Sequence, residues 1–279
     1  MRPACGHTAT NDGAARAHCG MTGRRPGGTQ LAAFVLHRYA WSETSLILEL
    51  FTREQGRVVA VAKGAKRPYS QLRSVLLPLQ RVTVSLGRHP SGDESAGEIH
   101  TLRAADYGGG APMPAGAAIF AGLYLNELLL KLLARYDPHP LLFDAYAESV
   151  EALGIGDDAS VQAALRAFEL MLLRETGLLP ELATETVTQQ ALDPARRYTL
   201  SPEGGLVAAG GSSAALTGTA WLALHAALGQ GSDLAAVREA CADHLALLRS
   251  VLRGVLHYHL GSSQLRTRQV MQDMQRLLE

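Results

Sequence analysis

The residues whose types and spacing most directly suggest chemistry lie at positions 63–70, in the sequence KGAKRPYS. Flexible cations on a loop suit the phosphates of a nucleic acid, and a glycine lets the backbone approach a ligand closely. Tyr69 is suited to stacking on a base. Arg57 and Arg73 flank the segment. A solvated basic loop that binds no ligand fits the same pattern, and contacts of this kind do not read base sequence.

Charge is segregated along the chain, although its formal total is zero. Residues 53–88 hold eight basic side chains and a single acid, whereas residues 117–190 hold eleven acids and four bases. Residues 244–272 carry four arginines and no acid. Since a local excess of charge decides whether a polyanion binds, this distribution favours a polyanionic partner for part of the chain.

Enzyme motifs are missing from the sequence. It contains neither a P-loop nor a nucleophile elbow. Gly154-Ile155-Gly156 is half of a dinucleotide fingerprint without a preceding strand, and His257 and His259 have no further ligands nearby. We therefore predict no enzyme, no cofactor and no metal site. A DNA hydrolase or nuclease with widely spaced catalytic groups is the alternative, but the basic segment has no carboxylate cluster to support it.

The three cysteines are too widely spaced for a disulfide framework, and this favours a reducing cytoplasm. No apolar run is long enough for a membrane span. Residues 1–30 have no apolar periodicity, and we interpret them as a disordered leader. The leader holds four residues that either ligate zinc or occur by chance: Cys5, His7, His18 and Cys19.

Residues 31–107 have the pattern of a small β domain. Five short runs are rich in β-branched and apolar residues and are separated by turn signals. They cover residues 31–37, 44–52, 57–63, 79–86 and 98–103. A closed barrel is the economical way to hide so many strand edges.

Beyond a Gly/Pro break at 108–116, the apolar period becomes helical. The expected helices cover 119–136, 143–153, 161–172 with Ser160 as N-cap, 220–228, 234–260 and 265–278. Residues 178–215 lack a clean period, but 197–200 and 205–208 flank a turn and predict a hairpin.

The helix expected at 119–136 is apolar on more than one face. It is either buried in a helical domain or forms part of a groove for a partner peptide. In the second case Arg166, beside Leu165 and Phe168, is the cation that meets a peptide carboxylate. The amino-acid composition does not distinguish a buried helix from one that forms part of a peptide groove.

Several motifs resemble the RecO family of bacterial recombination mediators in order and spacing. They are AFVLH at 33–37, WSETS at 41–45, FT at 51–52, GR at 56–57, VAKGA at 61–65, TLR at 101–103, LYLNELL at 123–129, LRAFE at 165–169 and LRTR at 265–268. The resemblance covers about residues 31–275.

The resemblance implies an α+β fold, with an N-terminal OB-fold β-barrel at 31–107 followed by an all-helical domain at 108–279. A small hairpin insertion at 178–215 is expected inside the helical domain. The resemblance to RecO also implies binding to single- and double-stranded DNA, annealing of complementary strands, assembly with RecR and docking of the C-terminal tail of SSB. Through these activities the protein is expected to help load RecA onto DNA, in the cytoplasm and at the nucleoid. A protein–protein adaptor that does not bind DNA is the alternative.

Residues carried over from the resemblance fall into two sets. The DNA-binding set is Arg57, Lys63, Lys66, Arg67, Arg73, Arg103, Arg266 and Arg268. The SSB-tail set is Phe120, Leu123, Tyr124, Leu165 and Arg166. Many relatives carry a four-cysteine zinc module, whereas residues 180–206 here contain no cysteine. The hairpin must then hold by packing alone or remain loosely ordered.

Overall fold

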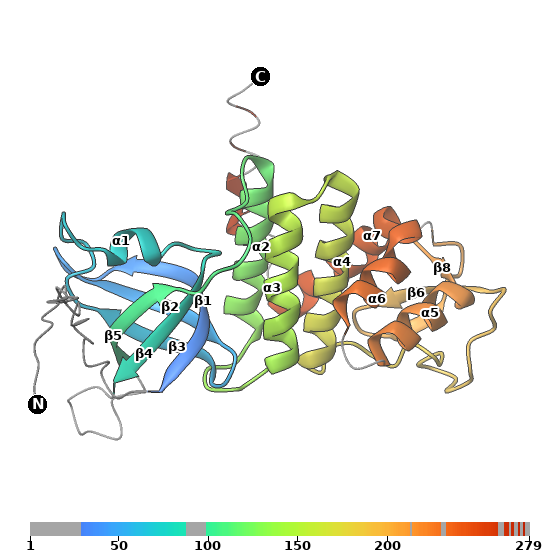
Figure 1. The fold of residues 1–279 in the computed structure, drawn as a ribbon. Coiled ribbons are helices and arrows are strands. Elements are labelled where there is room, and N and C mark those ends of the chain that lie inside the picture. Colours follow the sequence, from blue (N-terminus) through green and yellow to red (C-terminus); the bar gives the residue numbers. More distant parts are fainter. Residues whose placement is uncertain are drawn as a thin grey trace, which may run out of the picture.

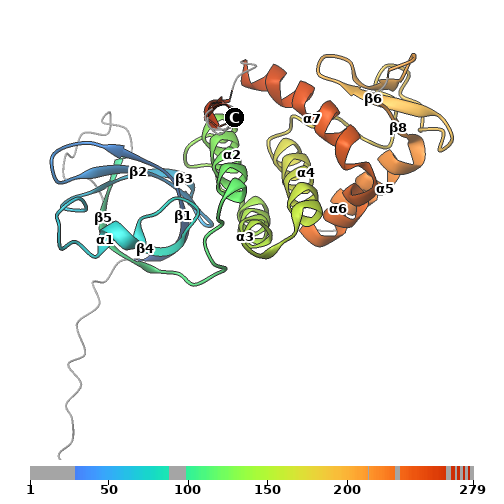
Figure 2. The same ribbon diagram turned by 90° about the horizontal axis from the view of Figure 1, so that it is seen from above.

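The computed structural model describes residues 29–87, 99–212, 214–229, 233–261, 265–267, 269–270, 273 and 276. A β-barrel lies at one end of the molecule and a helical region continues from it (Figures 1 and 2). This confirms the expected α+β class. The candidate zinc ligands between Cys5 and Cys19 lie outside the described residues. The first strand begins at Gln30, and the last residue of the expected leader therefore belongs to the barrel.

All five expected strands form, and they close in the order β1-β2-β3-β5-β4. Their bounds are β1 Gln30–Ala40, β2 Leu46–Thr52, β3 Gly56–Ala62, β4 Arg81–Gly87 and β5 Ile99–Tyr107. β3 and β5 pair in parallel and the other neighbours are antiparallel. A short helix that the sequence did not predict, α1 (Leu72–Val75), packs Leu72 and Val75 against the barrel core.

The side chains of β1 point alternately to its two faces, and this explains how the barrel is attached to the helices. Ala33 and Val35 point into the barrel core, while Phe34 and Leu36 belong to a second core shared with the helices. The Phe34 ring centroid lies 5.3 Å from that of Phe143 on α3 (Pro140–Ile155). Because successive strand residues face opposite sides, one strand contributes to both cores.

The helical region consists of α2 (Ala117–Leu132), α3, α4 (Asp158–Glu175), α5 (Gly218–Gly229), α6 (Leu234–Cys241) and α7 (Leu245–Leu260). The helix expected at 234–260 is wrong as one element, because a 3₁₀ turn at Ala242–His244 divides it. The expected cap of α4 is also wrong. Asp157 is the N-cap, and its carboxylate accepts from the Ser160 N–H.

The hairpin predicted around 197–208 is confirmed. β6 (Arg197–Ser201) and β7 (Gly205–Ala208) pair antiparallel, and β8 (Leu216–Thr217) adds a third strand. Its apolar side chains Tyr198, Leu200 and Leu206 are buried in the shared core, and the Trp221 indole N–H donates to the Tyr198 carbonyl at 3.1 Å. Packing and backbone hydrogen bonds therefore hold this hairpin. It lies at the end of the molecule away from the barrel (Figure 2).

A second contact between barrel and helices, here called the seam, involves Gly56, Arg57 and residues 135–137. Gly56 has φ +68°, and a Cβ there would lie 2.0 Å from the Asp137 carbonyl oxygen. The Tyr136 N–H donates to the Arg57 carbonyl at 3.0 Å. The helix predicted to reach Tyr136 ends at Leu132 instead, because residues 133–137 leave it to join the barrel.

No helix in the described part of the chain is long and apolar enough to cross a membrane.

Candidate nucleic-acid interface and peptide pocket

One end of the barrel, here called the rim, brings two loops together. Ala40, Leu46 and Ala62 lie side by side across β1, β2 and β3. The turn at 41–45 and the basic loop at 63–70 therefore leave the sheet at the same end. Lys66 fixes the contact, since its N–H donates to the Thr44 carbonyl at 2.9 Å and its Nζ to the Ser42 carbonyl at 2.8 Å.

The rim cations Lys63, Lys66, Arg67 and Arg73 are all exposed. Within the described residues, none of them forms an ion pair with a carboxylate. Tyr69, on the same loop, is 99% exposed. Lys63, Lys66 and Arg67 thus share one loop, and Arg73 follows on α1, where its N–H donates to the Ser70 carbonyl at the end of that loop. Together these four members of the predicted DNA-binding set carry positive charge that no carboxylate among the described residues pairs with.

Arg57, from the same predicted set, lies elsewhere. Its side chain is mostly buried at the seam, where its guanidinium donates to the Leu130 carbonyl at 2.6 Å and lies 4.0 Å from the Glu49 carboxylate. Burial lowers the pKa of Arg57. Arg135 donates to the same Glu49 carboxylate at 2.6 Å. Arg57 is therefore part of a partly buried ion-pair network that joins the barrel to the helices.

Arg103 and Arg266 lie outside the two rim loops. Arg103 is exposed on β5, and its guanidinium covers Gly87, where a Cβ would lie 2.2 Å from the Arg103 Nε. Arg266 is exposed and close enough to β1 to add to the effect of burial in lowering the pKa of His37. Arg268 lies outside the described residues.

Glu127 of α2 holds the segment that carries Arg266. Its carboxylate accepts from the backbone N–H groups of Arg266 and Thr267, at 2.9 and 3.0 Å, and from the Thr267 hydroxyl at 2.7 Å. Burial alone would raise the pKa of Glu127, but these hydrogen bonds and the nearby Lys131 charge together lower it. A carboxylate so placed stabilises the start of a helix.

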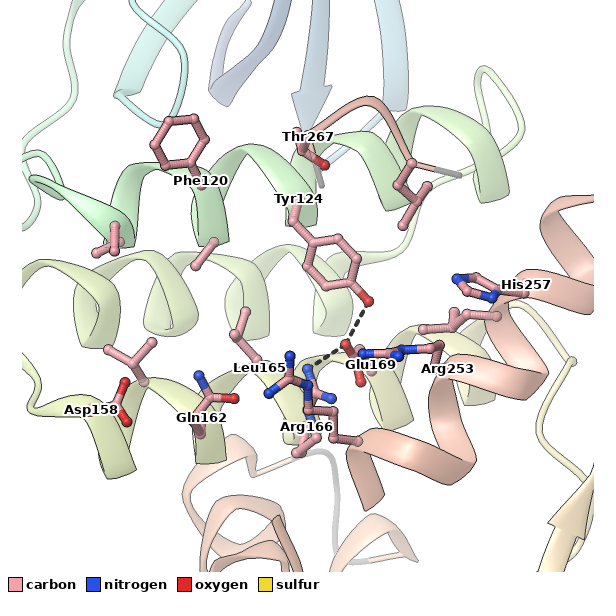
Figure 3. Close-up of a pocket in the computed structure, with 17 residues that line it drawn as sticks. Phe120, Tyr124, Asp158, Gln162, Leu165, Arg166, Glu169, Arg253, His257 and Thr267 are labelled. Carbon is pink, nitrogen blue, oxygen red and sulfur yellow. Dashed lines mark hydrogen bonds and ion pairs between the residues drawn. The ribbon is translucent and has the colours of Figure 1, made fainter. Parts of the chain in front are cut away.

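A pocket of about 420 Å³ opens between α2, α4 and α7 (Figure 3). Of the predicted peptide-binding set, Phe120, Tyr124, Leu165 and Arg166 line it, and Leu123 does not. The pocket is also lined by Glu169, Arg249 and Arg253, which were not predicted from the sequence. The two α7 arginines belong to the acid-free stretch at 244–272, so a signal for them was present.

Arg166 is not an isolated cation in this pocket. It is 6% exposed and donates to the Glu169 carboxylate at 2.7 Å, while the Tyr124 hydroxyl donates to the same oxygen at 2.6 Å (Figure 3). Burial raises the pKa of Glu169, and the Arg166 charge and the Tyr124 hydrogen bond oppose that rise. This network fixes the guanidinium at the base of an apolar-walled cavity.

The pocket can accept an apolar group that carries a carboxylate. Its walls include Ala121, Val161, Leu165 and Leu256, and α7 adds Arg249, which is exposed. A few charged groups on an apolar cavity wall are typical of a site that orients a small ligand or peptide end. No group of three or more His, Cys, Asp or Glu side chains in the described segments is arranged to hold a metal ion.

Comparison with known proteins identifies the family. The family described as "Recombination protein O N terminal" matches residues 28–104, and "Recombination protein O C terminal" matches residues 113–269. The chain belongs to the RecO family.

Curated RecO relatives are similar over nearly their whole length. A "DNA repair protein RecO" of Albidiferax ferrireducens is 51% identical over 246 residues, which cover 88% of this chain and 95% of the relative. Relatives from Verminephrobacter eiseniae and Variovorax paradoxus are each 52% identical, over 88% of this chain and 96% of each relative. The predicted family is thereby confirmed. The names of the family and of these relatives refer to DNA repair and recombination.

Proposed function

We propose that the chain binds single- and double-stranded DNA through the barrel rim, anneals complementary strands, and assists the loading of RecA onto SSB-coated gaps together with RecR. This places it in the cytoplasm, at the nucleoid. The observation that carries the proposal is the group of four exposed rim cations with no carboxylate partner among the described residues. A surface of this kind gains free energy by neutralising phosphates and releasing their counterions.

We assign Lys63, Lys66, Arg67 and Arg73 to the centre of the DNA surface, with Arg103, Arg266 and Arg268 as additions. Arg57 is omitted, because its guanidinium is committed to Leu130 and Glu49. The surface belongs to a proposed OB-fold domain at residues 31–107, followed by a helical domain at 108–279.

We assign the α2–α4–α7 pocket to the acidic, hydrophobic C-terminal tail of SSB. An apolar side chain of that tail fits between α2 and α4, and its terminal carboxylate fits the arginines at the pocket edge. Phe120, Tyr124, Leu165 and Arg166 contribute from the original set, and we add Arg249 and Arg253. Anchoring through the tail raises the local concentration of the protein on SSB-coated DNA.

The test of the proposal is fluorescence anisotropy of a labelled single strand against the full chain, measured across a salt series. We expect affinity to fall steeply with salt, with a slope of about 0.7 per neutralised phosphate. An absence of binding even at low salt contradicts the DNA-binding function. Salt-insensitive binding to a peptide, without DNA affinity, would instead identify a protein–protein adaptor.

A further inference from the structure

Large aromatic side chains are exposed around the rim. Trp41 is 66% exposed and Tyr69 is 99% exposed, and Tyr39 at the end of β1 is 47% exposed. Rings of this size normally bury most of their surface, because exposing them to water forfeits a large hydrophobic gain. Their position beside the basic loop therefore calls for a ligand that offers flat, apolar faces together with negative charge.

The backbone around Trp41 is fixed rather than loose. The Trp41 N–H donates to the Ser45 carbonyl at 3.2 Å, and the Ser45 N–H donates to the Ser42 hydroxyl at 3.1 Å. Lys66 then ties this turn to the basic loop through Ser42 and Thr44. The strand register sets Trp41 and Lys63 two strands apart, at a backbone separation of roughly 10 Å.

The charge beside Trp41 is complementary to a phosphate backbone. The rim carries four positive charges, on Lys63, Lys66, Arg67 and Arg73. The 41–45 turn adds one negative charge, on Glu43. A single strand offers both phosphates for these cations and unstacked bases for an aromatic ring. In a duplex the base faces are already covered by their neighbours, so only the cations would find partners.

We propose that Trp41 is a stacking platform for an unpaired base of single-stranded DNA, with Tyr69 as a second platform and the rim cations on the flanking phosphates. The inference rests on the proposed function for the identity of the ligand. It adds the residue that makes the rim prefer single strands over duplexes.

Intrinsic fluorescence can test this stacking, because the chain has two tryptophans. Trp221 is completely buried in the helical region, with its indole N–H bonded to the Tyr198 carbonyl. Quenching by an added oligonucleotide therefore reports on Trp41. We expect oligothymidylate to quench the emission of the full chain, and a duplex with the same number of phosphates to leave it nearly unchanged.

A variant series separates stacking from charge. Trp41→Ala should weaken single-strand affinity about tenfold, while Trp41→Phe, which keeps a flat ring, should retain most of it. The slope of affinity against salt should be the same in both variants, since no phosphate contact is lost. Tyr107→Ala is the matched control. Tyr107 is also exposed, but it pairs with Val82, which pairs with Ala33, eight residues before Trp41.

Two results would count against the inference, and they differ in what they leave standing. Salt-dependent DNA binding with no quenching, and with full affinity in Trp41→Ala, would overturn the stacking role but leave the DNA-binding function intact. An absence of DNA binding in the unaltered chain at low salt would overturn the proposed function and the inference together.

Discussion

The rim and the pocket both depend on cationic side chains, but the rim exposes its lysines and arginines whereas the pocket buries Arg166. At the rim the cations are exposed and have no carboxylate partner within the described residues. In the pocket Arg166 is 6% exposed and is bonded to Glu169, which is 1% exposed and also accepts from Tyr124. The rim keeps its charge available, whereas the pocket has compensated the charge of Arg166 and keeps that of Arg249 exposed at its edge.

This difference separates two kinds of recognition. Exposed cations contribute nearly independently, adapt to a mobile polyanion and weaken as salt screens them. A buried, hydrogen-bonded guanidinium has a fixed direction and is less screened, so it can orient one carboxylate but is also part of the fold. Replacing a rim cation should therefore change binding alone, whereas replacing Arg166 should change stability as well.

The largest effect is expected for Arg166→Ala, because it leaves the Glu169 carboxyl group buried without its cation, where it must either stay charged or take up a proton. Removing one member of a buried pair costs about 3–5 kcal/mol of unfolding free energy. Urea unfolding at pH 7.5, followed by circular dichroism, measures this loss. Lys63→Ala is the control, because Lys63 is exposed, and its unfolding midpoint should stay within experimental error of the original chain.

The Arg166→Ala loss should also depend on pH. Without Arg166, burial raises the pKa of Glu169 further, so the folded state binds a proton that the unfolded chain has released. Stability then falls as pH rises from the ordinary carboxyl pKa through the raised one, and it is regained on acidification. The difference between variant and original should therefore shrink toward pH 5. A loss that is constant between pH 5 and 7.5 would contradict this account of Glu169.

The second prediction concerns the rim. Combined Lys63→Ala, Lys66→Ala and Arg67→Ala should weaken single-strand binding by roughly 100-fold at low salt and reduce the salt slope by about 2, which is 0.7 for each lost phosphate contact. Anisotropy over a salt series measures both quantities. Arg196→Ala, an exposed cation beside the β6 hairpin, serves as the control. An unchanged slope in the triple variant would remove these residues from the DNA surface.

The third and smallest prediction sharpens the pocket. Arg249→Glu should weaken binding of a peptide with the acidic SSB tail sequence by about tenfold, because it reverses an exposed charge at the pocket edge. The unfolding midpoint should fall far less than in Arg166→Ala, because Arg249 is exposed and acts on the buried Glu169 only through its charge. Calorimetric titration with the peptide measures the affinity, and the same peptide with an amidated C-terminus tests whether the terminal carboxylate is recognised. Full affinity in the variant would place the peptide elsewhere.

The barrel was readable from the sequence because each strand is bounded by its own turn signal, and strand periodicity is local. The errors arose where distant residues decide the outcome. Helix α2 stops at Leu132 because the chain then turns toward the barrel, where the Tyr136 N–H donates to the Arg57 carbonyl. The break before α7 falls within a run of regular apolar spacing, so the period did not reveal it.

The site was predictable to the level of residue type but not of orientation. Arg57 and Lys63 are both cations of the basic segment, and only tertiary packing directs Arg57 into the seam. The Arg166–Glu169 pair could have been predicted from the sequence, since residues three apart on a helix are neighbours. The contact between the 41–45 turn and the basic loop depends on strand register, which turn signals alone did not define.

The seam has a mechanical consequence. Gly56 lies so close to the Asp137 carbonyl that no side chain fits between them, and Arg135 and Arg57 meet Glu49 beside it. Such a joint opposes hinge motion, so we expect the rim and the pocket to move together as one body. If both proposals hold, the protein sets the shortest stretch of nucleic acid that can join a captured SSB tail to the strand on the rim.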